Sequence, residues 1–408
     1  MPVQANRCRA RSGAIALLFA VSALPWPLAG GEGRAVDPSV LRSGIRLAGE
    51  YLVRVCDSNG RFEYVRHSDP FRRPRPSYNI LRHAGAMYAL ADYHRWSADP
   101  AALAAVERAA GFLRSRCVRP VEGISGALAI WSGASIDGDS GPARAKLGGA
   151  GLALVGLTNL EALKPGSVPR EEMAAIGRFI LFLQREDGFF VKGFTPSKGG
   201  KDDDWQSLFY PGEAVLGLSM LFEIDGDVRW RDAAVRGLKF LATSRRGQVP
   251  PADHWALIAT ARLLEKHTAG ASAEDQASLL SHARDIVRAM LDDRDDIGAD
   301  PLLQGSWGKD GRTTPTATRL EGLLAIMDLA SKDDPAMRKE VEAVVEHGIA
   351  FLLRSQFREG ILVGGIPKSV LQAQPGADPM AGEVRIDYVQ HALSALIQYA
   401  RRLRITSN

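Results

Sequence analysis

The stretch FILFLQREDG, residues 179–188, carries the pattern on which the fold prediction rests. It recurs as YLVRVCDSNG at 51–60 and as FLLRSQFREG at 351–360, and the fragment FLRSRC at 112–117 repeats its first part. In each full copy an aromatic residue is followed five positions later by Cys or Gln. A glycine stands four positions further on and is suited to ending a helix. The spacing predicts an internal repeat of helices that end alike.

Two kinds of helical pattern alternate along the chain. Amphipathic, charged segments cover residues 38–56, 100–117, 169–185, 228–245, 273–293 and 335–356. Segments richer in Ala, Gly and Leu follow them at 78–95, 144–163, 208–223, 252–266, 316–330 and 386–404. Charged helices with one wet face belong outside, and small-residue helices belong inside. The sequence therefore predicts an all-α (α/α)6 barrel of six outer–inner hairpins over residues 36–408.

The inner segments align by their small-residue and leucine-rich ends. In that register the equivalent residues are Gly85, Gly149, Glu213, Trp255, Glu321 and His391. Three positions earlier stand Arg82, Lys146, Tyr210, Ala252, Thr318 and Tyr388. Polar residues thus gather near the starts of the inner helices. The long outer-to-inner links at 57–77, 118–143, 186–207, 294–314 and 357–385 would rim the same face, which we take as the functional one.

The first 35 residues are predicted to be a secretory signal peptide. Three arginines precede an apolar run at 13–24, and small residues follow at 29–35. No later segment is apolar enough to span a membrane, so we expect a periplasmic or secreted protein. Removing the four arginines and one glutamate of 1–34 from totals of 51 basic and 47 acidic residues leaves 47 and 46. This near-neutral balance gives no argument for a nucleic-acid partner.

Cys56 and Cys117 occupy the same register in neighbouring outer helices. An oxidising compartment permits a bond between them. We therefore predict a disulfide that joins the first two hairpins.

Six such hairpins resemble the α/α toroid, an architecture shared by six-hairpin glycosidases, several polysaccharide lyases and epimerases, terpenoid cyclases and protein prenyltransferases. The segment QREDGFF, residues 184–190, is similar to the Gln-x-x-Asp-Gly-Trp/Phe repeat of the cyclase and prenyltransferase branch. That motif is structural, and the resemblance names no catalytic family. The zinc site of the prenyltransferases needs a cysteine beside Asp and His. Here Cys56 and Cys117 fall at outer-helix ends, so the sequence departs from that pattern.

Glu213 and Glu321 are the leading catalytic candidates. They recur at one register on the third and fifth inner helices, where both would point toward the axis of the ring. Paired carboxylates are what glycoside hydrolysis requires, and a wide separation favours inversion. Inner-helix ends are the usual site in the glycosidases that the fold resembles. An alternative reading makes Glu213 a helix-start acid that stabilises the dipole of its helix.

Asp387 and His391 are four residues apart and share one helix face. They are candidates for a carboxylate-oriented histidine that transfers protons, or for a buried hydrogen-bonded pair. The residues His83, His254 and His391 are a further candidate set for a metal. No close ligand spacing supports that set, so we assign no metal and no cofactor.

Cations and aromatic rings near the same ends suggest substrate binding. The candidates are Arg82, His83, Lys146, Tyr210, Asp253, His254, Trp255, Arg319 and Tyr388. Aromatic platforms beside Arg and Lys suit a carbohydrate that bears carboxylates or sulfates. The alternative is that the aromatic residues are packing residues.

The sequence thus predicts an exported enzyme that hydrolyses an anionic, uronate-containing oligo- or polysaccharide. A polysaccharide lyase or uronate epimerase is the closest alternative. It would use Tyr210 or Tyr388 with His391 to remove a proton, and Arg82 to neutralise the substrate carboxylate. A third possibility is a non-catalytic protein that binds or assembles an envelope glycan.

Overall fold

The computed structural model describes residues 36–408, with gaps at 74–76, 139–140, 205–206 and 408. By its contacts the chain divides into Met1–Ala35 and Val36–Asn408, and only the second unit is described. The predicted signal peptide lies outside the described residues. Within the described part of the chain, no helix is long and apolar enough to cross a membrane.

Among the described residues, twelve long helices alternate as the sequence predicts. The outer helices are α1 (Pro38–Val55), α3 (Pro100–Cys117), α6 (Arg170–Leu183), α8 (Val228–Ser244), α10 (Ala273–Asp292) and α12 (Pro335–Ser355). The inner helices are α2 (Ile80–Ser97), α5 (Leu147–Leu163), α7 (Tyr210–Asp225), α9 (His254–Lys266), α11 (Thr313–Ala330) and α13 (Ile386–Arg402). Every boundary lies within three residues of its predicted position.

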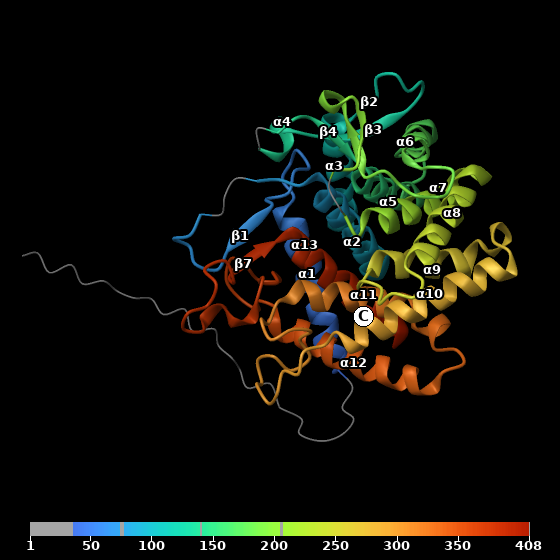
Figure 1. Cartoon of the computed structure of the whole chain (residues 1–408). Coiled ribbons are helices and arrows are strands. Elements are labelled where there is room, and N and C mark those ends of the chain that lie inside the picture. Colours follow the sequence, from blue (N-terminus) through green and yellow to red (C-terminus); the bar gives the residue numbers. More distant parts are fainter. Residues whose placement is uncertain (1–35, 74–76, 139–140, 205–206, 408) are drawn as a thin grey trace, which may run out of the picture. The chain divides into compact units, whose positions relative to one another are not determined.

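The inner helices close into a ring. Each packs against the next in the order α2, α5, α7, α9, α11 and α13, and α13 returns to α2 (Figure 1). The outer helices cover this ring, as α3 does on α2 and α12 on α11. The predicted (α/α)6 barrel is therefore confirmed.

Capping side chains begin five of the six outer helices, all except α6, whose N-cap is Pro169. A side-chain oxygen accepts a hydrogen bond from the first turn of each of the five: Asp37 from Ser39 N, Asp99 from Ala101 N, Asp227 from Arg229 N, Ser272 from Asp275 N and Asp334 from Met337 N. Such caps satisfy backbone donors that have no partner inside the helix. They explain why Asp and Ser recur in the inner-to-outer links.

The repeated motif at the outer-helix ends has a mechanical role. Its Cys or Gln reaches a backbone carbonyl in the next outer helix: Cys56 Sγ to Ala105 O at 3.7 Å, Gln184 Nε2 to Ala233 O at 2.9 Å and Gln356 Nε2 to Gly44 O at 2.9 Å. The motif glycine then brings the turn against that helix. A Cβ on Gly60 would lie 1.9 Å from Arg108 O, and Gly60 has a φ of +82°. The motif therefore joins successive outer helices.

This packing also overturns the predicted disulfide. Cys56 and Cys117 are both free and buried. The Cys56 sulfur faces Ala105 in α3, and Cys117 lies twelve residues further along the same helix. Twelve residues at 1.5 Å each place it about 18 Å away along the helix axis. Cys56 and Cys117 therefore lie too far apart to form a disulfide, although they hold equivalent positions in the sequence repeat.

Short strands lie in four of the long outer-to-inner links, at 57–77, 118–143, 186–207 and 357–385. A five-stranded sheet orders β2 (Val118–Pro120), β3 (Leu128–Ser132), β4 (Arg144–Lys146), β5 (Gly193–Thr195) and β6 (Gly200–Asp202). Its strands β2, β3 and β4 lie near α4 (Ala134–Asp137) in Figure 1. A second pair joins β1 (Val65–His67) to β7 (Glu383–Arg385), so the first and last links meet.

Candidate active site

Three polar side chains meet inside the ring of inner helices. They are His254 at the start of α9, Glu321 in α11 and His391 in α13, and we call them the His–Glu–His cluster. Each offers one ligand atom, and these atoms lie within 4.8 Å of one another. Glu321 Oε2 is 2.5 Å from His391 Nδ1, and the centroids of the two imidazole rings are 5.4 Å apart. The sequence predicted all three residues and grouped His254 with His391 in a candidate metal set, but it paired Glu321 with Glu213 instead.

Aromatic rings surround His254. Its ring centroid lies 4.9 Å from that of Phe209 and 5.1 Å from that of Trp255. Trp255 in turn lies 6.3 Å from Tyr88 of α2, which stands opposite α9 in the ring. Contact between opposite inner helices places these residues in the interior of the barrel. The cluster therefore sits in an apolar, aromatic setting.

The cluster is buried, and burial governs its protonation. His254 is 2% exposed and Glu321 is fully buried, whereas the side chain of His391 keeps 12% exposure. Burial lowers the pKa of His254 well below its ordinary value, and the charges of His391 and Arg319 add to this. Burial raises the pKa of Glu321, although the charge and hydrogen bond of His391 oppose the rise. A neutral His254 beside a shared Glu321–His391 proton is a setting for proton transfer.

Two glycines allow the inner helices to bring these groups together. A Cβ on Gly322 would lie 3.0 Å from the Cα and Cβ of His254, so α11 and α9 are in contact at His254 and beside Glu321. A Cβ on Gly85 of α2 would lie 2.8 Å from Oε1 of Gln390. The amide nitrogen of Gln390 is 3.1 Å from His391 Nδ1. Close backbone packing thus fixes the position of His254 and supports that of His391.

Glu213 forms a separate feature on α7. It is 5% exposed, and its Oε2 has no hydrogen-bond partner among the described residues. Burial raises the pKa of Glu213 to about 8, and the nearby charge of Asp253 adds to the effect. A Cβ on Gly148 would lie 2.2 Å from this Oε2 and 2.4 Å from the ring of Tyr210. Glu213 is thus a protonated acid at neutral pH, packed between α7 and α5.

Asp387 belongs to a cluster with two arginines rather than to a pair with His391. Arg385 donates to both carboxylate oxygens, at 2.6 and 2.9 Å, and Arg82 Nε lies 3.1 Å from Oδ2. Burial alone would raise the pKa of Asp387, but the hydrogen bonds of Arg385 and the charges of both arginines hold it below its ordinary value. The predicted Asp387–His391 pair is replaced by Glu321–His391.

Two predicted substrate-binding residues have structural partners instead. His83 uses both ring nitrogens, with Tyr78 Oη at 2.7 Å and Ala109 O at 2.9 Å, and burial lowers its pKa to about 4. Its ring therefore points toward α3, outside the predicted three-histidine set. Asp253 is fully buried, caps α9 and pairs with Arg245 at 2.8 Å. Burial raises its pKa, and Arg245 opposes the rise.

The other predicted cations and aromatic residues lie around the starts of the inner helices. Arg319 pairs with Asp293 at 2.6 Å and lies 5.4 Å from the Trp307 ring. Lys146 ends β4 at the start of α5. Tyr388 stacks under Arg385 at 4.4 Å. Arg82 keeps 34% of its side chain exposed, against 18% for Arg319, and it contacts the hydroxyl of Tyr64.

The sequence reasoning missed two aromatic residues of the site, Tyr64 and Tyr88. Tyr88 stands three positions after Gly85 in an inner-helix register, a spacing that places both on one face of α2. That spacing was a usable signal. Tyr64 lies in a link before β1, and its contact with Arg82 depends on how that link folds back. Sequence alone carried no signal for it.

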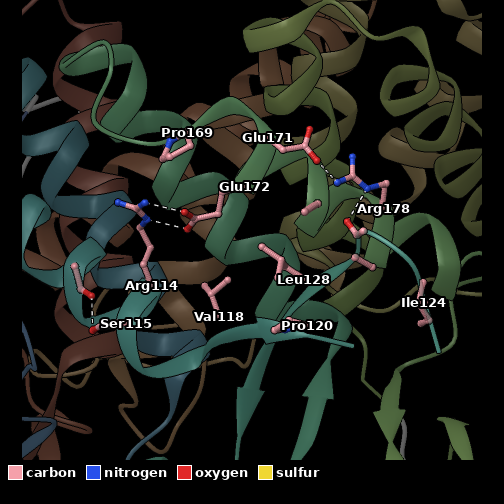
Figure 2. A pocket seen from close by; sticks show the side chains of 14 residues that line it. Arg114, Ser115, Val118, Pro120, Ile124, Leu128, Pro169, Glu171, Glu172 and Arg178 are labelled. Atoms are coloured by element: carbon pink, nitrogen blue, oxygen red, sulfur yellow. Dashed lines mark hydrogen bonds and ion pairs between the residues drawn. The ribbon is translucent and has the colours of Figure 1, made fainter. Parts of the chain in front are cut away.

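A groove on the outer surface lies away from these residues. It has a volume of about 910 Å³ between α3, α6 and the β2–β3 link, and its floor is apolar (Figure 2). Arg114 pairs with Glu172 at 2.7 Å on one side, and Arg178 pairs with Glu171 on the other. Because its charges are already paired, the groove lacks groups poised for chemistry. The inner cluster is the stronger candidate for the active site.

The fold places this chain in the class of (α/α)6 toroids. It is similar to D-mannose isomerase, with a TM-score of 0.63, 11% identity, and 89% of this chain and 97% of that chain covered. It is also similar to cellobiose 2-epimerase from Bacillus thermoamylovorans B4167, with a TM-score of 0.62 and 10% identity; the match covers 90% of this chain and 99% of that chain. A third similar structure is the GH76A α-1,6-mannanase of Salegentibacter sp. HEL1_6, with a TM-score of 0.58 and 12% identity; the match covers 88% of this chain and 99% of that chain.

Identities this low establish the fold and nothing further. No model of a protein family matches the chain, and no curated protein matches it.

Proposed function

We propose that this protein is a sugar-active enzyme that moves a proton at a carbon next to a carbonyl group, as an epimerase or isomerase does. The observation that carries the proposal is the His–Glu–His cluster, with two imidazoles 5.4 Å apart and one of them bonded to a buried carboxylate. Toroids of similar fold include a sugar isomerase and a sugar epimerase, which supports the reaction class by analogy.

The cluster assigns a role to each residue. With the shared proton on His391 Nδ1, Glu321 orients the ring and Nε2 carries the lone pair that can take a proton from the substrate. His254 is neutral because burial depresses its pKa, so it holds one N–H and one lone pair. It can deliver or accept the second proton. Glu321 is therefore a positioning residue, and the two histidines are the proposed catalytic residues.

The substrate that we propose is a reducing sugar or a uronate, and the protein is proposed to be exported. Trp255 and Phe209 supply apolar faces on which a sugar ring can pack. Arg82 is partly exposed in the first turn of α2, and we propose that its guanidinium, which also pairs with Asp387, binds a sugar carboxylate. Export rests on the signal peptide predicted for residues 1–35.

Hydrolysis of a glycan remains a second candidate because of Glu213. A carboxyl whose pKa is raised to about 8 is protonated at neutral pH and can donate to a leaving oxygen. The predicted partner is less suited to its role, because Glu321 is bonded to His391 instead of being available to activate water. No hydrogen bond or ion pair joins the two carboxylates within the described residues. This geometry lowers hydrolysis from the leading prediction to the second candidate.

Solvent exchange separates the two candidates. The full chain is incubated in D2O with mannose, cellobiose, glucuronate or an α-1,6-mannan oligosaccharide, and the products are followed by NMR. Proton transfer places deuterium on the carbon beside the carbonyl and creates no new reducing ends. His254→Asn and His391→Asn should each slow the exchange by about 10²-fold or more. New reducing ends without deuterium would instead support hydrolysis and contradict the proposal.

A further inference from the structure

The His–Glu–His cluster also has the composition of a metal site. We propose that it binds one divalent transition-metal ion of the Zn²⁺ class, and that the bound ion blocks proton transfer. The second half rests on the proposed function. An ion on His391 Nδ1 moves that ring's one proton to Nε2, and the ion also occupies the lone pair of His254, so neither ring keeps the lone pair that the reaction needs. The first half concerns His254, Glu321 and His391 alone.

The distances suit such an ion after a small adjustment. The three ligand atoms lie within 4.8 Å of one another. In a tetrahedral site with bonds near 2.1 Å, ligand atoms are roughly 3.4 Å apart. The widest separation must therefore shrink by about 1.4 Å, and the Glu321–His391 bond must open by about 1 Å. Side-chain rotation on three fixed helices can supply shifts of this size.

Besides these distances, buried polar atoms without hydrogen-bond partners favour a metal ion at the cluster. Among the described residues, both ring nitrogens of His254 are buried without hydrogen-bond partners, whereas the buried Glu321 lies beside the hydroxyl of Ser394. Buried polar atoms left unpaired are costly, and a metal ion would satisfy one of these nitrogens. His254 is held in place by Gly322 and by the cap at Asp253, so its ring faces the cluster at little extra entropic cost.

The donor set selects the class of ion. Two imidazoles and one carboxylate suit Zn²⁺, Co²⁺ or Ni²⁺, whereas Ca²⁺ and Mg²⁺ prefer sites made of oxygen atoms. Three protein ligands leave a fourth position for water or substrate, as in catalytic zinc sites. The partly exposed side of His391 gives the ion a route of entry.

Metal binding is tested first, without reference to activity. The tag-free full chain is stripped with a chelator and titrated with Co²⁺ alone, and the visible absorption of four-coordinate Co²⁺ is recorded. We expect one ion per chain, displaced by Zn²⁺. His254→Ala, Glu321→Gln and His391→Asn should each weaken binding at least about tenfold. The matched control is His347→Ala, which removes an exposed histidine of α12 and should leave the affinity unchanged.

The outcomes separate the metal site from the proposed function. Equal Co²⁺ affinity in the wild type and in whichever cluster variants fold would overturn the site. If the metal site is confirmed, one equivalent of Zn²⁺ should slow deuterium exchange at least about tenfold, and chelation of the ion should restore the exchange rate. Exchange unchanged by bound Zn²⁺ would overturn the blocking effect. Co²⁺ binding by a protein whose metal-free form shows no exchange would overturn the proposed function and leave the metal site intact.

Discussion

Glu321 Oε2 lies 2.5 Å from His391 Nδ1, and this contact joins α11 to α13 across 70 residues of sequence. The carboxylate is fully buried, while the histidine keeps part of its surface exposed. A buried acid that orients a partly exposed imidazole defines which ring nitrogen faces the substrate. The pair therefore links the packing of the inner ring to the proposed chemistry.

Glu321→Gln should abolish most of the activity without unfolding the protein. The amide has the same shape but cannot act as a carboxylate toward His391, so we expect turnover to fall by about 10²-fold. Deuterium exchange measures turnover, and its pH profile should change because Glu321, whose pKa is raised by burial, no longer titrates. Glu340→Gln, on an exposed position of α12, is the control. Full activity with an unchanged pH profile in Glu321→Gln would show that the contact is structural only.

Glu213 should make the protein less stable as the pH rises. Its carboxyl ionises near pH 4.5 when unfolded and at about 8 when folded. Between these values the folded state holds a proton that the unfolded state has released, so stability falls with increasing pH. At 1.36 kcal/mol per unit the loss amounts to at most roughly 5 kcal/mol. Urea unfolding at pH 5 and pH 9 should show that Glu213→Gln removes most of this fall.

The exposed residue Glu186 provides the control for Glu213. Glu186→Gln should leave the difference in unfolding free energy between pH 5 and pH 9 as it is in the wild type. If Glu213→Gln loses stability with pH as steeply as the wild type does, Glu213 is not a buried, protonated acid. Its candidacy as a proton donor in hydrolysis would then end.

Two glycines on different helices should respond to alanine in opposite directions. Gly322→Ala places a methyl group 3.0 Å from His254, so we expect a loss of about 1–3 kcal/mol and slower exchange. Gly111→Ala meets nothing within 4 Å on α3, so it should gain about 0.5–1 kcal/mol through helix propensity. Thermal and urea unfolding measure both changes. A neutral Gly322→Ala with full activity would contradict the tight α9–α11 contact.

The ion cluster of Asp387 should contribute stability that acid removes. Its folded pKa lies below 3.8, so the contribution is present above that value and is lost as the pH falls through the folded pKa. Asp387→Asn leaves Arg385 and Arg82 without their shared carboxylate and should cost about 3–5 kcal/mol at pH 7. Unfolding at pH 7 and near pH 2.5 should show this cost shrinking in acid. An equal cost at both values would mean that the charge is not the cause.

Local patterns were enough to predict the helices and their order. Apolar spacing along α1 or α6 depends on residues within a few turns, and the caps Asp99 and Asp227 act on their own helices. The repeat then implied a closed ring, because each inner helix has two apolar flanks to bury. Sequence register also selected Glu213, Glu321 and His391 as residues at one level of the barrel.

The partners of those residues were decided by tertiary structure alone. Sequence spacing predicted that Asp387 would pair with His391. In the structure Asp387 instead accepts hydrogen bonds from Arg385, and His391 pairs with Glu321 of another helix. Likewise Cys56 shares its register with Cys117 but faces Ala105. Sequence by itself determined the helices, their order and the level at which polar residues gather. The offset and close approach of neighbouring helices, set by backbone contacts such as Gly322 against His254, decided which side chains meet.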